Sequence, residues 1–287
     1  MRKMMIAALT PALLAGFASA ALAGETLDRV MKNKLLVEVT DQAYPPFSYI
    51  DDSGEVVGFD IDISKEIAKR LGVDYKVETP SWEIIVAGNW NGRWDICVCS
   101  MTPTAERAQV LDFVNEYYES PAVIAVNVDN TDINSAADLN GKKVSVQVGT
   151  KSVAFVKQAF PQVQLVEVEK NQEMFNLVDI GRADALVTGK PAAFQYMRTR
   201  PGLQVLEPQL TTEEYGMALR KDTPEPVVQT LYKALTATLS DPAVRAGLEA
   251  QSQQVSRPLS LQEAAQAYAD GTAQFRALAK TIQLQPQ

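Results

Sequence analysis

The stretch Ser100-Met-Thr-Pro-Thr-Ala-Glu-Arg107 joins a strand to the segment that follows it. Residues 96–99, directly before it, are apolar, which predicts a buried strand. Pro103 suits the first position of a helix, with Thr102 or Thr104 as the N-cap. The sequence therefore predicts a turn between a buried strand and a helix, with the unpaired N–H groups of that turn facing solvent.

This turn gathers groups that bind anions. A carboxylate placed there would accept two parallel hydrogen bonds from the guanidinium of Arg107 and further bonds from the hydroxyls of Ser100 and Thr102. Lysine would not reproduce that geometry, because its ammonium is a point charge. We therefore expect an anion-binding corner. The alternative is an ordinary capped turn with a surface arginine.

Helices and strands alternate on both sides of this turn. The pattern Gly-Arg-x-Asp followed by an apolar run occurs within residues 91–98 and again within 180–187, where glycine would end a helix and aspartate would precede a strand. Such alternation predicts an α/β fold of mostly parallel sheets with helices on both faces. Ligands bind such sheets at the carboxyl ends of strands, where the 100–107 stretch and Gly149-Thr150 fall. Strands are expected at 35–40, 75–78, 122–126, 143–148 and 164–168, and a helix at 61–71, capped by Asp60 and ended by Gly72.

The chain begins with a pattern typical of a secretory signal peptide. Arg2 and Lys3 precede an uncharged, largely apolar stretch, and Ala21-Leu-Ala23 forms an A-x-A cleavage site. Polar and helix-breaking residues interrupt the apolar stretch, which disfavours the alternative of a membrane anchor. We expect residues 1–23 to be cleaved off after Ala23 and the mature protein to be released into a periplasm.

Composition and net charge limit the classes of molecule that the protein is expected to bind. The formal net charge of −8 falls to −10 when Arg2 and Lys3 leave with the signal peptide, so no basic stripe exists for nucleic acid. A chain of 287 residues with 46% hydrophobic residues suits one large or two medium domains. We expect a monomer.

The two cysteines, Cys97 and Cys99, are separated by one residue. On a regular strand their side chains would lie two strand steps apart, further than the roughly 3.5–4.5 Å between Cβ atoms that a disulfide needs. We therefore expect two buried thiols. The chain has no histidine, so a zinc site would lack its usual ligands, and no metal or cofactor is predicted.

Short motifs follow one another along nearly the whole mature chain, and in this order they resemble the polar-amino-acid-binding proteins of bacterial ABC importers. The motifs are Asp41-Gln-Ala-Tyr-Pro-Pro-Phe47, Gly58-Phe-Asp-Ile-Asp-Ile63, Ser81-Trp82, Trp94-Asp95 ahead of the 100–107 stretch, Asp112-Phe113, Tyr117-Tyr118, Val148-Gly-Thr150, Gly181-Arg-Ala-Asp184 and Tyr215-Gly216.

The resemblance implies a two-lobed periplasmic binding protein fold of type II. Residues 24–122 plus 214–287 would form the first lobe and residues 127–208 the second. Each lobe would be a mostly parallel sheet flanked by helices, and two extended crossings near 122–127 and 208–217 would form the hinge.

The resemblance also implies ligand residues. It places the ring of Tyr44 against the ligand, with Phe47 in the core, and Trp82 is a second aromatic candidate. Asp41, at a strand end, would meet a cationic group of the ligand or form an Asx turn before the prolines. Thr150, in a segment that joins a strand to a helix, would grip the ligand's carboxylate from the second lobe while Arg107 grips it from the first.

The family pattern fails after residue 187. Related proteins usually place there an aspartate that binds the ligand's α-ammonium, but this chain has Thr188-Gly-Lys-Pro191. Gly189 cannot form an ion pair. Lys190 has two possible orientations. It would face the ligand and attract a second carboxylate, which favours a solute with an extra acid group or a blocked amine, or it would turn outward to solvent. Asp41 or Glu119 could supply the missing negative charge for a plain amino acid.

The expected function is therefore to bind a small amino-acid-like carboxylate in a periplasm and deliver it to an inner-membrane ABC permease, without catalysis. One alternative is a periplasmic enzyme on the same fold, similar to cyclohexadienyl dehydratase. In the absence of histidine, Glu119 or Glu83 would then act as general acid. The other alternative is a soluble sensor of the same ligand, which would share every ligand residue.

Overall fold

The computed structural model describes residues 27–250 together with Glu263 and Gln266. The predicted signal peptide lies outside the described residues, as does most of the chain after residue 250 that was assigned to the first lobe. Helices and strands alternate along the described chain, which confirms the α/β class. Among the described helices, none combines the length and apolarity that a membrane span requires.

Eleven strands form three sheets in the described chain. A six-stranded sheet has the order β6-β11-β7-β10-β8-β9, β1 pairs with β5, and β2, β3 and β4 form a small antiparallel sheet. The strands are β1 (Leu35–Val39), β2 (Ala43–Tyr44), β3 (Ser48–Ile50), β4 (Val56–Val57), β5 (Asp74–Glu78), β6 (Cys97–Met101), β7 (Leu111–Asn127), β8 (Lys143–Gln147), β9 (Gln164–Val168), β10 (Ala185–Gly189) and β11 (Leu203–Arg220).

The prediction of mostly parallel pairing is only partly met. The pairs β1–β5, β8–β9 and β8–β10 are parallel. However, β7 pairs antiparallel with β10 and β11, and β11 pairs antiparallel with β6. The reason is that β7 and β11 are long crossing strands, of 17 and 18 residues, rather than units of the alternating pattern.

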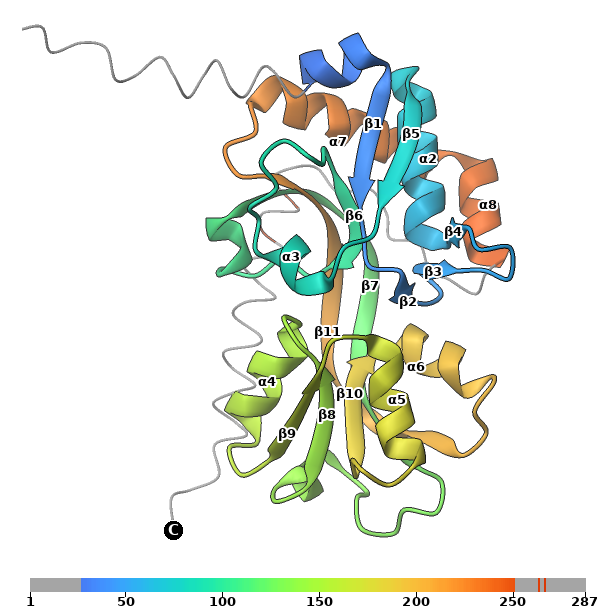
Figure 1. Cartoon of the computed structure of the whole chain (residues 1–287), viewed down its shortest axis with the longest axis vertical. Coiled ribbons are helices and arrows are strands. Elements are labelled where there is room, and N and C mark those ends of the chain that lie inside the picture. The colour runs from blue at the N-terminus through green and yellow to red at the C-terminus, as the bar shows by residue number, and fades with distance from the viewer. Residues whose placement is uncertain (1–26, 251–262, 264–265, 267–287) are drawn as a thin grey trace, which may run out of the picture.

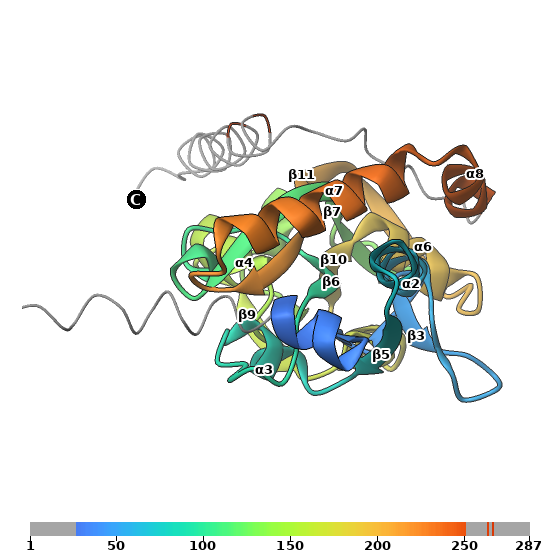
Figure 2. The same cartoon turned by 90° about the horizontal axis from the view of Figure 1, so that it is seen from above.

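The helices flank these sheets. They are residues 27–33, α2 (Phe59–Leu71), α3 (Trp82–Val86), α4 (Lys151–Ala159), α5 (Asn171–Asp179), α6 (Lys190–Met197), α7 (Glu225–Ser240) and α8 (Pro242–Ala250), with short 3-10 turns at Arg107–Gln109 and Ala136–Leu139. Figure 2 shows α7 lying across β7 and β11, and it also packs on α2.

Helix α2 begins and ends at glycines. Gly72 takes the left-handed conformation (φ 70°) that closes it, as predicted. The N-cap is Gly58 rather than Asp60, so the predicted cap is wrong. Asp60 is fully buried in the first turn, where its carboxylate accepts hydrogen bonds from other elements.

The strands β7 and β11 run side by side along the molecule (Figure 1). At one end of these strands lie β1–β6 with α2, α3, α7 and α8, and we call this the β1–β6 end. At the other end lie β8–β10 with α4–α6, and we call this the β8–β10 end. The core changes along β7: Tyr117 and Tyr118 pack into the apolar cluster of α2 and α7, whereas Val123 and Ile124 pack into clusters of the β8–β10 end. Both ends therefore have their own hydrophobic core.

Candidate functional site

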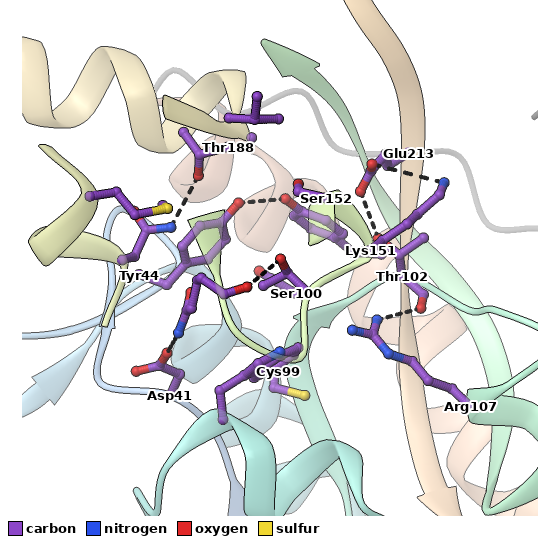
Figure 3. Close-up of a pocket in the computed structure, with 18 residues that line it drawn as sticks. Asp41, Tyr44, Cys99, Ser100, Thr102, Arg107, Lys151, Ser152, Thr188 and Glu213 are labelled. Atoms are coloured by element: carbon purple, nitrogen blue, oxygen red, sulfur yellow. Dashed lines mark hydrogen bonds and ion pairs between the residues drawn. The ribbon is translucent and has the colours of Figure 1, made fainter. Parts of the chain in front are cut away.

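A cavity lies where the carboxyl end of β6 meets the starts of α4, α5 and α6 (Figure 3). Seven of the eight predicted site residues line it, and Lys190 does not. The lining residues are Asp41, Tyr44, Trp82, Cys99, Ser100, Thr102, Arg107, Gln147, Thr150, Lys151, Ser152, Asn171, Met174, Val187, Thr188, Gly189, Glu213 and Tyr215.

Arg107 is buried at the edge of this cavity. Its Nη1 donates to the carbonyl oxygen of Thr102 (2.7 Å) and its Nη2 to that of Gly149 in the β8–β10 end (2.8 Å). Burial lowers the pKa of Arg107 to about 10, opposed by the charges of Glu213 and Glu106. The guanidinium therefore stays protonated at neutral pH, and two of its five N–H groups are used by carbonyl oxygens.

The turn before Arg107 is shorter than predicted. Only residues 107–109 form a 3-10 turn, so the expected helix starting at Pro103 is wrong. The N-cap of this turn is Glu106 rather than Thr102 or Thr104, so the predicted cap is also wrong. Oγ1 of Thr104 still accepts a hydrogen bond from the backbone N–H of Arg107 (3.1 Å). Strand β7 begins at Leu111, directly after this turn, and leaves no room for a longer helix.

Ser100 is held by a buried network. Its φ of 54° lies in the left-handed region, a conformation that costs about 1–3 kcal/mol for a residue other than glycine. Its Oγ donates to Asp60 (2.8 Å) and its N–H donates to the Tyr117 hydroxyl (2.7 Å), which donates to Asp60 (2.9 Å). Burial raises the pKa of Asp60 to about 7, opposed by the hydrogen bonds from Ser100 and Tyr117. The network fixes the position of Ser100 in the cavity wall.

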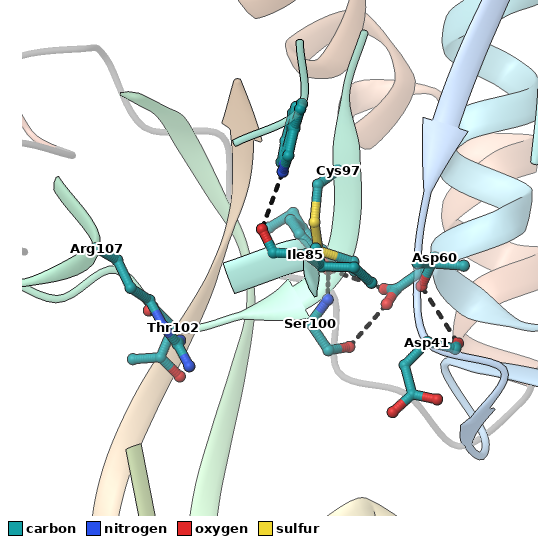
Figure 4. The surroundings of a disulfide bond; sticks show 11 residues. Asp41, Asp60, Ile85, Cys97, Ser100, Thr102 and Arg107 are labelled. Carbon is teal, nitrogen blue, oxygen red and sulfur yellow. Dashed lines mark hydrogen bonds between the residues drawn. A yellow bond between two sulfur atoms is a disulfide. The ribbon is translucent and has the colours of Figure 1, made fainter. Parts of the chain in front are cut away.

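A disulfide bond supports the same wall (Figure 4). Between the pairs Cys97–Ala218 and Met101–Gly216, three residues of β6 face one residue of β11, so β6 contains a bulge. The bulge brings the Cα atoms of Cys97 and Cys99 to 5.1 Å, and the two side chains are bonded to each other. The prediction of two buried thiols is therefore wrong, because it assumed a regular extended strand.

Several hydrogen bonds cross the cavity from one end of the molecule to the other. Besides Arg107, Trp82 donates from Nε1 to the carbonyl oxygen of Gly149 (3.2 Å). The carboxylate of Asp41 accepts from Gln147 Nε2 (2.8 Å) through one oxygen and from the N–H of Ala43 (2.8 Å) through the other. Asp41 thus forms the Asx turn and also lines the cavity, so both predicted roles are compatible. Burial raises the pKa of Asp41, opposed by the bond from Gln147.

Tyr44 reaches the cavity with its hydroxyl. The ring stacks on Phe47, with 5.4 Å between centroids, and Phe47 is fully buried as expected. The hydroxyl forms a 2.7 Å hydrogen bond with the hydroxyl of Tyr215. Burial raises the pKa of Tyr44, so the phenol stays protonated. Thr150, at the start of α4, donates from Oγ1 to the carbonyl oxygen of Gln147 (2.7 Å).

Sequence reasoning missed Glu213, Lys151 and Asn171. Glu213 on β11 accepts from Thr102 Oγ1 (3.1 Å) and lies 3.9 Å from Lys151 Nζ. Glu213 stands two residues before the Tyr215-Gly216 motif and Lys151 directly follows Thr150, so both adjoin motifs that the sequence did single out. No comparable signal marks Asn171, which the fold alone brings to the cavity.

A model of the "bacterial extracellular solute-binding proteins, family 3" matches residues 36–250. The chain belongs to this family. It is 32% identical to a probable amino-acid ABC transporter-binding protein of Haemophilus influenzae, over 68% of this chain and 77% of that protein. It is 28% identical to ABC transporter arginine-binding protein 1 of Escherichia coli, over 84% of this chain and 95% of that protein.

Solved structures of amino-acid-binding proteins share the fold of this solute-binding protein. An ancestral amino acid-binding protein, a precursor of cyclohexadienyl dehydratase, is 36% identical with a TM-score of 0.73, over 80% of this chain and all of that chain. The arginine-bound form of ArgBP from T. maritima, truncated, is 31% identical with a TM-score of 0.69, over 72% of this chain and 98% of that chain.

Three residues considered from the sequence lie away from the cavity of this solute-binding protein. The ammonium of Lys190 pairs with Glu207 Oε1 (2.6 Å), which favours the alternative that it turns outward. Glu119 and Glu83 are exposed and do not line the cavity. Among the described residues, no group of three or more Cys, Asp or Glu side chains is placed to hold a metal ion.

Proposed function

We propose that this family 3 solute-binding protein binds an amino acid in the cavity at Arg107 and delivers it to an inner-membrane ABC permease. The observation that carries the proposal is the buried guanidinium of Arg107, which faces the cavity beside the hydroxyls of Ser100 and Thr102 and retains N–H groups for a carboxylate. The amino-acid-binding relatives support the same class of ligand.

The protein would work as two lobes that close on the ligand. Residues 24–122 with 214–287 would form one lobe and residues 127–208 the other, joined where β7 and β11 cross between them. The separate hydrophobic cores support this division. The carbonyl oxygen of Gly149, which accepts from both Arg107 and Trp82, would bring the lobes together, and a ligand that contacts both would stabilise the closed form.

The ligand's α-ammonium would pair with Asp41 or Glu213. The aspartate that related proteins usually place after residue 187 is missing here, and Glu119 is exposed. Asp41 and Glu213 are the two carboxylates among the residues that line the cavity. We propose that the mature protein acts as a periplasmic monomer after cleavage at Ala23. The enzyme alternative loses support, because Glu119 and Glu83, its proposed general acids, lie away from the cavity.

Mass spectrometry of the small molecules that co-purify with the protein tests this function. We expect an amino acid, and calorimetry with that compound should give a single site per chain. Incubation of the protein with the compound should leave it chemically unchanged. Conversion to a product would favour the dehydratase alternative, and failure of every common amino acid to bind would overturn the proposal.

A further inference from the structure

One acceptor in the cavity wall has no partner. Asn171 is only 2% exposed, and its side-chain oxygen Oδ1 is buried. This oxygen accepts no hydrogen bond from the described residues. It is the one cavity-lining residue with such an atom among those that the structure describes. Buried acceptors are nearly always hydrogen-bonded in native proteins, so this oxygen indicates a donor that a ligand supplies.

Thr188 fixes the orientation of Asn171. The amide nitrogen Nδ2 of Asn171 donates to Thr188 Oγ1 (3.0 Å), which leaves Oδ1 as the free end of the amide. Thr188 accepts this bond, and its own O–H is still available as a donor. The two residues, both of which line the cavity, therefore present one acceptor and one donor side by side. A primary amide or ureido group, which carries both N–H and C=O, complements that pair.

Next to this pair, β10 contributes no charge. A side chain at Gly189 would collide with the hydroxyl of Tyr44 and would lie 2.9 Å from that of Tyr215. The space that an acid on β10 would need is thus occupied by two phenols, which stay protonated because burial raises the pKa of each. This part of the cavity is neutral.

The charges of the cavity already balance. Its lining contains two carboxylates, Asp41 and Glu213, and two cations, Arg107 and Lys151. A zwitterionic amino acid with a neutral side chain keeps that balance. An amino acid with a cationic side chain would add an unpaired positive charge inside the closed cavity, which is costly where water is excluded.

We infer that the cavity selects net-neutral L-amino acids whose side chain ends in a carboxamide or ureido group, with Asn171 and Thr188 as the side-chain subsite. This inference rests on the proposed function. It names the ligand class within that function and differs from the arginine that some relatives are named for.

The test uses L-citrulline and L-arginine, which have nearly the same shape but differ in charge, together with L-glutamine. Calorimetry would measure their affinities for the wild-type protein, Asn171→Leu, Asn171→Asp and Asn176→Leu. Asn176→Leu is the matched control, because it makes the same substitution on the exposed side of the same helix. Thermal unfolding of each variant shows whether it is folded.

We expect the wild-type protein to bind citrulline or glutamine at least about tenfold more tightly than arginine. Asn171→Leu should weaken binding of the neutral ligand by about tenfold or more, and Asn176→Leu by less than about threefold. Asn171→Asp adds a negative charge with almost no change of shape, so it should shift the preference toward arginine. This variant also keeps the test decisive if Asn171→Leu fails to fold.

Two results would overturn the inference alone. One is arginine binding to the wild-type protein as tightly as both neutral ligands, and the other is equal affinities for Asn171→Leu and Asn176→Leu. Binding of some other amino acid, with none of the three probes bound, would also refute only the ligand class. If no amino acid binds at all, the proposed function itself fails.

Discussion

The two walls of the cavity are held in different ways. On the wall from the β1–β6 end, Ser100 is fixed by the Asp60–Tyr117 network and by a disulfide that closes the bulge of β6. On the wall from the β8–β10 end, groups are placed by the starts of α4, α5 and α6, with the Asn171–Thr188 bond as a buried side-chain link. We infer from this difference that the wall from the β1–β6 end (the first wall) is formed before the ligand arrives, and we propose that the wall from the β8–β10 end (the second wall) contributes the selectivity.

Removing the anchor of the first wall should have the largest effect. Arg107→Ala should cost about 2–5 kcal/mol of binding free energy, because truncation leaves a ligand carboxylate buried without its partner. Arg107→Lys should recover part of this loss, since lysine restores the charge but not the parallel donors. Calorimetry with the co-purified ligand measures both. A loss of less than about threefold for Arg107→Ala would remove the residue from the site.

The network behind Ser100 should make stability depend on pH. The pKa of Asp60 is about 7 in the folded protein and about 4 when unfolded, so the folded state binds more protons between these values. Stability should therefore fall as pH rises from about 4 to 7, by at most about 1.4 kcal/mol per pH unit from this group.

Urea unfolding of the wild-type protein and Asp60→Asn at several pH values checks this slope. The variant cannot ionise at this position, so its stability should fall less steeply over the same window. Burial and the charges of Glu214 and Glu119 raise the pKa of Glu116. Its titration adds a similar pH dependence of stability to both proteins, so it cancels in the difference between their curves. Parallel curves for the two proteins would show that Asp60 does not titrate in this range.

Breaking the disulfide should loosen the first wall. The double substitution Cys97→Ser and Cys99→Ser opens a very short loop, for which chain entropy predicts a loss of about 1–2 kcal/mol of stability. Ligand affinity should fall as well, because Ser100 lies in the bulge that the bond closes. Reduction of the wild-type protein should reproduce both effects. An unchanged affinity with lowered stability would mean that the Asp60 network alone positions Ser100.

The first wall was largely predictable from the sequence, and the reason is that its groups are local. Arg107, Thr102 and Ser100 lie within eight residues, so one short motif indicated their common site. The disulfide was missed because the sequence does not reveal the bulge that brings Cys97 and Cys99 together. Only the pairing with β11, more than 100 residues later in the chain, creates it.

The second wall was less predictable, because its groups converge only in the folded chain. Asn171 looks like any polar residue at the start of a helix, and its unpaired oxygen depends on the distant Thr188. The sequence also left the direction of Lys190 open, since the same position at a helix start permits a side chain toward the ligand or away from it. In the structure Glu207, on the neighbouring β11, decides the direction.

Tyr44 belongs to the first wall, its hydroxyl lies close to Gly189 of β10, and its substitution should have an intermediate effect. Tyr44→Ala removes the ring and should weaken binding more than Tyr44→Phe, by about 0.5–1.5 kcal/mol if the ring contacts the ligand. Tyr44→Phe removes the bond to Tyr215 but keeps the stacking on Phe47. Calorimetry and thermal unfolding separate the two roles. Equal losses of affinity would assign the effect to the hydroxyl, and unfolding of either variant would assign Tyr44 to the core.

The smallest effect is expected at Lys190, where the second wall meets solvent. Its ammonium pairs with Glu207, whose side chain is 58% exposed, and exposed pairs of this kind contribute about 0–1 kcal/mol. Lys190→Ala should therefore change ligand affinity by less than about twofold, and added salt should not enlarge the difference. Calorimetry at two salt concentrations, with Lys151→Ala as the comparison inside the cavity, measures this. A tenfold loss for Lys190→Ala would mean that Lys190 leaves Glu207 when ligand binds, so that the second wall supplies charge as well as selectivity.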